Sequence, residues 1–137
     1  MDDFNFYLQE ILMKDIKSVE NELRKLSLEE YPQAIIRSGA WSNPSIVMAY
    51  TSFFRTGNPA EESTDFVVQL TVSEDSVEFR VDIAYSNGEM IADLLYEVIK
   101  FQTKDELLIK ANEYSKKASE LLINKLRELY INGFLAK

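Results

Sequence analysis

Apolar residues at both ends of the chain recur every three or four positions, which is the spacing of one face of an α-helix. This spacing predicts an amphipathic helix over residues 4–26 and a second one over residues 103–131. Thr103 and Glu106 form a capping-box pattern, in which each side chain can accept a hydrogen bond from the other residue's backbone N–H. The second helix is therefore expected to begin at Thr103.

Between the two helices, apolar residues alternate with polar ones, which is typical of strands that bury one face. Turn-forming residues separate the alternating segments, and Asn87-Gly88 favours a tight type I′ hairpin. The predicted strands are residues 34–38, 45–55, 65–72, 76–85 and 89–101. The chain is thus ordered as a helix, four or five strands, and a helix.

Two of the predicted hairpins share the strand between them, so their registers can be compared. If residues 74–75 and 87–88 are two-residue loops, Phe79 lies opposite Leu70 on one side and opposite Tyr96 on the other. Both registers place the same residues of the shared strand on the apolar side, namely Val77, Phe79, Val81 and Ile83. A slip of one residue would turn the partners of this strand to the wrong face, so the two registers support each other.

The order of the elements predicts an α+β fold with two layers. An antiparallel β-meander with one apolar face needs a cover, and the N-terminal helix and the long C-terminal helix are the segments that can supply it. We therefore expect four to five strands with both helices packed on one face of the sheet. With 137 residues and no repeat or linker in the sequence, the chain is expected to be a single domain over residues 1–137.

The composition excludes several kinds of chemistry. The chain has no cysteine and no histidine, which excludes thiol nucleophiles, disulfides, thiolate metal sites and histidine general bases. The formal net charge of −8 disfavours unspecific binding to nucleic acid and to anionic membranes. These features predict a protein that is not an enzyme, uses no cofactor and no metal, and does not bind nucleic acid.

The sequence has neither a secretory-signal pattern nor a candidate membrane span. A secretory signal begins with basic residues and continues with an unbroken apolar stretch, and the acidic N-terminal residues lack both. The longest unbroken apolar run is residues 46–50, whereas crossing a bilayer takes about 20 residues. We therefore expect a cytoplasmic protein that has no contact with membranes.

The same hairpin registers place a group of charged residues on the opposite face of the sheet. The candidate partner-binding residues are Glu78, Arg80, Asp82, Asp93, Leu95 and Glu97. Two pairs of like charges lie directly opposite each other in this arrangement, which is destabilising when solvent is their only neighbour. We interpret the face as a docking surface whose carboxylates attract a basic protein partner. The predicted function is a non-catalytic, acidic protein-interaction module of the inhibitor, immunity or chaperone kind.

Other interpretations of this acidic face stay open. The carboxylates can simply keep an exposed sheet soluble, with Arg80 between them, because exposed charge pairs contribute little to stability. Alternatively, an opposed pair, either Glu78 with Glu97 or Asp82 with Asp93, can hold a divalent metal ion or act in acid–base chemistry.

A small-ligand site is the alternative function. A cavity between the helices and the sheet would be lined by inward-facing aromatic and methionine side chains, namely Phe79, Tyr85, Met90 and Tyr96. The same residues would fill a solid core equally well.

The length of the C-terminal helix raises the question of a homodimer. A helix over residues 103–131 is about 43 Å long, whereas a ten-residue strand reaches about 33 Å. The overhang and the apolar residues Ile131, Phe134 and Leu135 can either dock on a second copy or fold back on the core.

Overall fold

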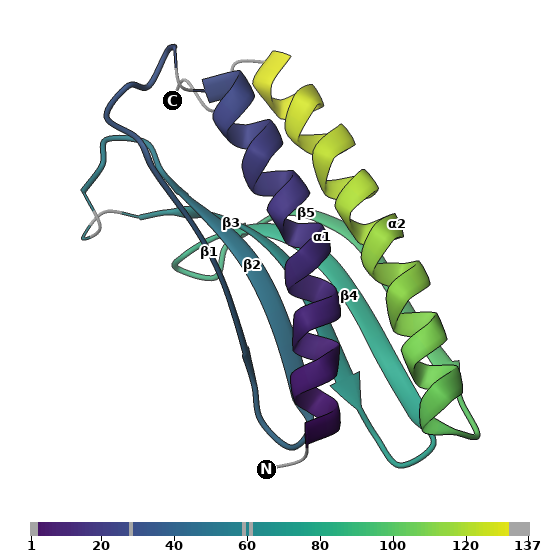
Figure 1. The fold of residues 1–137 in the computed structure, drawn as a ribbon. Helices are drawn as coiled ribbons and strands as arrows, with labels where there is room; N and C mark the ends of the chain where they lie inside the picture. The colour runs from purple at the N-terminus through teal and green to yellow at the C-terminus, as the bar shows by residue number, and fades with distance from the viewer. Residues whose placement is uncertain (1–2, 28, 59, 61, 132–137) are drawn as a thin grey trace.

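Five antiparallel strands and two helices form two layers in the computed structural model, which describes residues 3–27, 29–58, 60 and 62–131 (Figure 1). The elements in chain order are α1 (Asp3–Ser27), β1 (Ile35–Ser42), β2 (Ile46–Phe54), β3 (Thr64–Val72), β4 (Ser76–Tyr85), β5 (Met90–Lys100) and α2 (Lys104–Ile131). The strands form one sheet in the order β1-β2-β3-β4-β5, and both helices lie on one face of it. The predicted two-layer α+β fold is confirmed.

Local sequence signals account for the ends of the elements. The Thr103 side-chain oxygen accepts a hydrogen bond from the Glu106 backbone N–H at 3.1 Å, which satisfies one free donor at the start of α2. The Glu106 carboxylate accepts from the backbone N–H of Gln102, one residue before the donor that a capping box predicts. Between β1 and β2, the Asn43 side-chain oxygen accepts from the backbone N–H groups of Ser45 and Ile46 and so closes the predicted turn.

The core lies between the helices and the sheet. The residues of α1 that recur every three or four positions are buried: Leu8, Leu12, Ile16, Val19 and Leu23. On the sheet, alternate residues of β3 and β4 are buried, as in strands that bury one face. The Thr51 hydroxyl of β2 donates to the Ile16 carbonyl of α1 at 3.5 Å. In α2, the Tyr114 ring stacks on Phe79 of β4 with a centroid distance of 4.3 Å.

The two helices run side by side in the same direction (Figure 1). The Ser115 hydroxyl of α2 donates to the Ile11 carbonyl of α1 at 3.2 Å, and Arg127 forms an ion pair with Glu22 at 3.1 Å. The C-terminal turns of α2 therefore pack on α1 rather than projecting freely toward a second copy. Phe134 and Leu135 lie outside the described residues.

The β3–β4 register agrees with the prediction, since Leu70 pairs with Phe79 and Val68 pairs with Val81. The β4–β5 register agrees with the prediction at only two pairs, Ile83 with Ala92 and Asp82 with Asp93. Next to the turn Ala84 pairs with Met90, and the predicted type I′ turn at residues 87–88 is wrong, because Gly88 has a positive φ and Asn87 does not. On the other side of Asp82 the next pair is Val81 with Leu95, because a β-bulge leaves one extra residue in β5.

The bulge corrects two of the predicted site residues. Beyond it, every residue of β5 is shifted by one position, so Leu95 lies opposite Val81 and Glu97 lies opposite Phe79. Val81 and Phe79 are buried under the helices. Leu95 and Glu97 therefore lie on the face that the helices cover, and the prediction that they lie on the outer face is wrong.

Candidate partner-binding face

The helices leave one face of the sheet uncovered, and we call it the open face. Residues paired across the strands share a face, so the observed registers define rows that cross the whole sheet. The central row contains Trp41, Met48, Gln69, Arg80 and Tyr96. The acidic row beside it contains Gly39, Tyr50, Val67, Asp82 and Asp93.

The central row carries an exposed aromatic side chain at each end. Trp41 on β1 is 43% exposed and Tyr96 on β5 is 51% exposed. The Arg80 guanidinium lies 5.2 Å from the centroid of the Tyr96 ring, a distance at which cation and ring attract each other. The Tyr96 hydroxyl donates a hydrogen bond to the Glu78 carboxylate, and this bond raises the pKa of Tyr96. Tyr96 is therefore held in position between Arg80 and Glu78.

The acidic row places the Asp82 and Asp93 carboxylates opposite each other. Asp82 is partly buried and Asp93 is exposed. Burial raises the pKa of Asp82, the Arg80 charge lowers it, and the Asp93 charge raises it further. Within the described part of the chain, neither carboxylate forms an ion pair. An incoming cation would therefore meet two carboxylates that form no ion pair with a described residue, with only the nearby Arg80 charge acting on Asp82.

An aromatic ring also covers the β1–β2 side of the open face. A Cβ atom at Gly39 would lie 2.5 Å from the hydroxyl oxygen of Tyr50, so the absence of a side chain at Gly39 lets the Tyr50 ring lie across it. Nearby, Arg37 lies 5.8 Å from the centroid of the Phe54 ring. This aromatic surface was not predicted, because no register between these two strands was assigned from the sequence.

Four of the predicted site residues, Glu78, Arg80, Asp82 and Asp93, lie together on the open face. Glu97 does not join them, so the predicted pairing of Glu78 with Glu97 is wrong.

On the covered face, Glu97 of β5 contacts two residues of α2. It accepts a hydrogen bond from the Tyr114 hydroxyl and lies 3.6 Å from the Lys117 ammonium. The Tyr114 bond and the Lys117 charge lower the pKa of Glu97, and the same hydrogen bond raises the pKa of Tyr114 to about 12.

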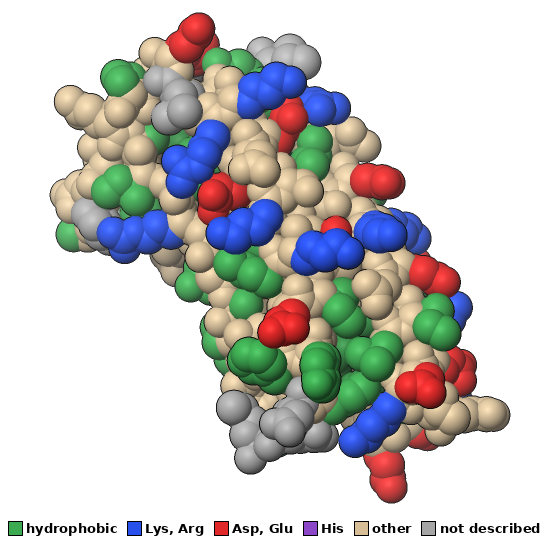
Figure 2. All heavy atoms as spheres, viewed as in Figure 1, with side chains coloured by type: hydrophobic (Ala, Val, Ile, Leu, Met, Phe, Trp, Pro, Cys, Tyr) green, Lys and Arg blue, Asp and Glu red, His purple; other side chains and the backbone are tan. Residues whose placement is uncertain are grey.

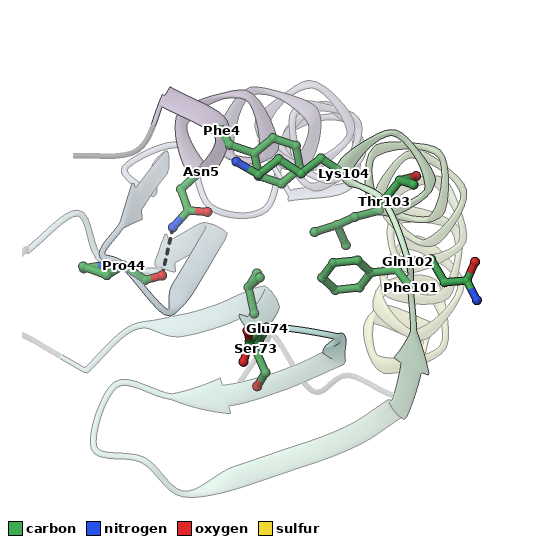
Figure 3. A pocket seen from close by; sticks show the side chains of 11 residues that line it. Phe4, Asn5, Pro44, Ser73, Glu74, Phe101, Gln102, Thr103 and Lys104 are labelled. Carbon is green, nitrogen blue, oxygen red and sulfur yellow. Dashed lines mark hydrogen bonds between the residues drawn. The ribbon is translucent and has the colours of Figure 1, made fainter.

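A cleft of about 430 Å³ opens between the two layers at the end of the molecule where both helices begin (Figure 3). Its apolar wall includes Phe4, Phe101 and Leu107. Asn5 is 4% exposed, and its amide N–H₂ donates to the Asn43 and Pro44 carbonyls. That anchoring leaves the amide oxygen of Asn5 pointing toward the cleft (Figure 3).

None of the residues predicted to line a ligand cavity lines this cleft. Phe79 is buried in the core, whereas Met90 and Tyr96 are exposed on the open face. The predicted cavity lining is therefore wrong, and the cleft is formed by the helix starts and the turns that face them.

The residues that the structure describes contain no group of three or more acidic side chains that could together hold a metal ion. Neither helix, over the residues that the structure describes, is long and apolar enough to cross a membrane. No protein-family model, no curated protein and no solved structure matches this chain.

Proposed function

We propose that the protein is a non-catalytic interaction module that binds a basic protein partner through the open face of its sheet. The observation that carries the proposal is the juxtaposition of exposed aromatic side chains in the central row with the opposed carboxylates of the acidic row. The proposed binding surface contains four residues of the predicted site, namely Glu78, Arg80, Asp82 and Asp93. The aromatic residues Trp41 and Tyr96 belong to it, whereas Leu95 and Glu97 do not.

The exposed side chains of the open face favour a protein partner over simple solvation. A sheet face that meets only water is normally polar. The open face nevertheless exposes four large apolar or aromatic side chains, those of Trp41, Met90, Tyr96 and Val98. Trp, Tyr and Arg are the residue types that most often dominate the binding energy of protein interfaces. The central row offers all three.

The acidic row supports a basic partner in particular. Asp82 and Asp93 repel each other across the strands, and a lysine or arginine placed between them would remove that repulsion. Since the whole chain carries a formal charge of −8, its long-range field also attracts a basic protein and speeds the encounter.

A comparison of two matched variants tests the proposal. The face variant Trp41→Ala/Asp93→Lys removes one exposed ring and reverses one exposed charge of the open face. The control variant Ile109→Ala/Glu120→Lys makes the same kinds of change at exposed positions of the helix layer. Each protein is immobilised and exposed to an extract of the cells it comes from, and the retained proteins are identified by mass spectrometry.

We expect basic proteins that the wild type and the control variant retain and the face variant loses. With a retained protein in purified form, the face variant should bind at least about 30-fold more weakly, because an aromatic interface anchor contributes about 2 kcal/mol or more. Association of the wild type should slow as NaCl is added. Equal retention by wild type and face variant would contradict the proposal.

A second candidate function, binding of a small amphipathic ligand, is favoured by the cleft at the helix starts. A volume of about 430 Å³ lies within the usual range for ligand sites, and Asn5 offers an acceptor beside an apolar wall. The dye 8-anilinonaphthalene-1-sulfonate is a suitable probe. It should shift the amide NMR signals of Asn5, Thr103 and Leu107, and Val72→Trp, which fills the cleft, should abolish those shifts. Shifts elsewhere only would exclude this candidate.

A further inference from the structure

A second surface with a distinct character lies on the outside of the helix layer. The first halves of α1 and α2 are separated by a shallow groove of about 330 Å³. Its lining consists of Tyr7, Glu10, Ile11 and Lys14 from α1, and Leu108 and Asn112 from α2. Hydrophobic side chains gather in the lower part of this face, where both helices begin, while Lys and Arg side chains dominate the part above it (Figure 2).

The apolar part of the groove is open to solvent. Tyr7 is 58% exposed, and Ile11 and Leu108 are only partly buried. Exposed apolar patches with a polar rim are typical of surfaces that bind another protein.

The rim of the groove carries one charge of each sign. Glu10 and Lys14 lie one turn apart on α1, a spacing at which opposite charges can form an ion pair. Neither of them forms an ion pair with any residue that the structure describes. Both charges are therefore available to a partner.

We propose that this groove is the contact surface of a two-fold symmetric homodimer. A two-fold contact uses the same patch on both copies, so the patch must be complementary to itself. When two α1 helices meet in opposite directions, Glu10 of each copy faces Lys14 of the other, and the Tyr7 rings and Leu108 side chains are covered between them. The contact differs from the overhang of the C-terminal helix that the sequence suggests, because Arg127 near the end of α2 already pairs with Glu22 of α1, and Leu129 and Tyr130 pack against the core.

The charge distribution also favours this surface over the open face for self-association. Two copies with a formal charge of −8 each repel one another, so they meet most easily where the local charge is balanced. Glu10 and Lys14 balance each other in the groove. On the open face, by contrast, a second copy would bring its own Asp82 and Asp93 toward the same two carboxylates.

Sedimentation velocity over a range of protein concentrations tests this dimer with a charge swap. The wild type should approach twice the mass of the single chain as concentration rises. Glu10→Lys and Lys14→Glu should each weaken dimerisation about tenfold, because two attractive contacts become repulsive at once. The double variant Glu10→Lys/Lys14→Glu restores opposite charges at both contacts, so its dimerisation should return close to that of the wild type.

Glu120→Lys is the control, since it makes the same charge change at an exposed position of α2 outside the groove. It should dimerise like the wild type, and circular dichroism should show that all variants keep the fold. A mass of one chain for the wild type at every concentration would overturn the proposal. So would a dimer that both single variants leave unchanged, or a double variant that stays as weak as the single ones.

Discussion

At Asp82 the fold places a carboxylate in a partly buried position opposite a second carboxylate. Burial raises the pKa of Asp82 above its ordinary value, and Asp93 adds to the rise although Arg80 opposes it. A raised carboxyl pKa means that the folded protein binds the proton more tightly than the unfolded chain. The ionised form of Asp82 therefore disfavours folding at neutral pH, and protonation at low pH removes that cost.

The variant Asp82→Asn tests this account, because it keeps the shape of the side chain without the charge. We expect its melting temperature at pH 7 to exceed that of the wild type. The difference should shrink as the pH falls toward 3.8, the ordinary pKa of an aspartate, because a raised pKa leaves more than half of Asp82 protonated in the folded wild type at that pH. Glu120→Gln controls for the loss of one negative charge. A melting temperature at or below that of the wild type at pH 7 would contradict the account.

At the scale of elements, the decisive feature is the β-bulge in β5. It places Leu95 and Ile99 under the helices and turns Tyr96 and Val98 to the open face. Leu94 and Leu95 both pack against the core. The strand can therefore contain the extra residue and lose little buried apolar area.

Alanine substitutions along β5 should distinguish the bulged register from a regular one. We expect Leu95→Ala and Ile99→Ala to lower the free energy of unfolding by about 1–3 kcal/mol each, less than for fully buried side chains. Val98→Ala, on the exposed side, should cost less than about 1 kcal/mol. Urea denaturation measures these changes. The reverse order, with Val98→Ala the most costly, would support the regular hairpin that the sequence suggests.

The elements show where sequence reasoning succeeds and where it fails. The β3–β4 register was predictable because the apolar residues of both strands alternate strictly, so a single register pairs Leu70 with Phe79. The bulge was not predictable, because Leu94 and Leu95 are both apolar and the alternation of apolar residues does not indicate which of them faces the core. For the same reason the predicted placement on the open face was right for the Asp82–Asp93 pair, on the turn side of the bulge, and wrong for Leu95 and Glu97, which follow it in β5.

At the scale of the whole molecule, the two layers are held together by the core rather than by their surface charges. Phe79 is buried and stacks on Tyr114, so it connects β4 directly to α2. The ion pair of Arg127 with Glu22 joins the helices, but the Arg127 side chain is exposed.

A pair of substitutions compares these two kinds of contact. Phe79→Ala should lower the free energy of unfolding by about 3–5 kcal/mol, because it leaves a cavity between the layers. Arg127→Ala should lower it by no more than about 1 kcal/mol, since exposed ion pairs are screened by water and salt. Thermal and urea denaturation of both variants measure the difference. Similar losses for the two would show that the layers depend on the ion pair far more than its exposure suggests.

The irregular pairing of β5 has a consequence for crowded solutions. β5 is the last strand of the sheet, and its pairing with β4 shifts at two places. Such irregularities bend a strand and interrupt the even sequence of free N–H and C=O groups along its outer side. A strand from a neighbouring molecule therefore finds no straight template to extend. The protein can thus expose apolar side chains without growing into fibres by end-to-end joining of its sheets.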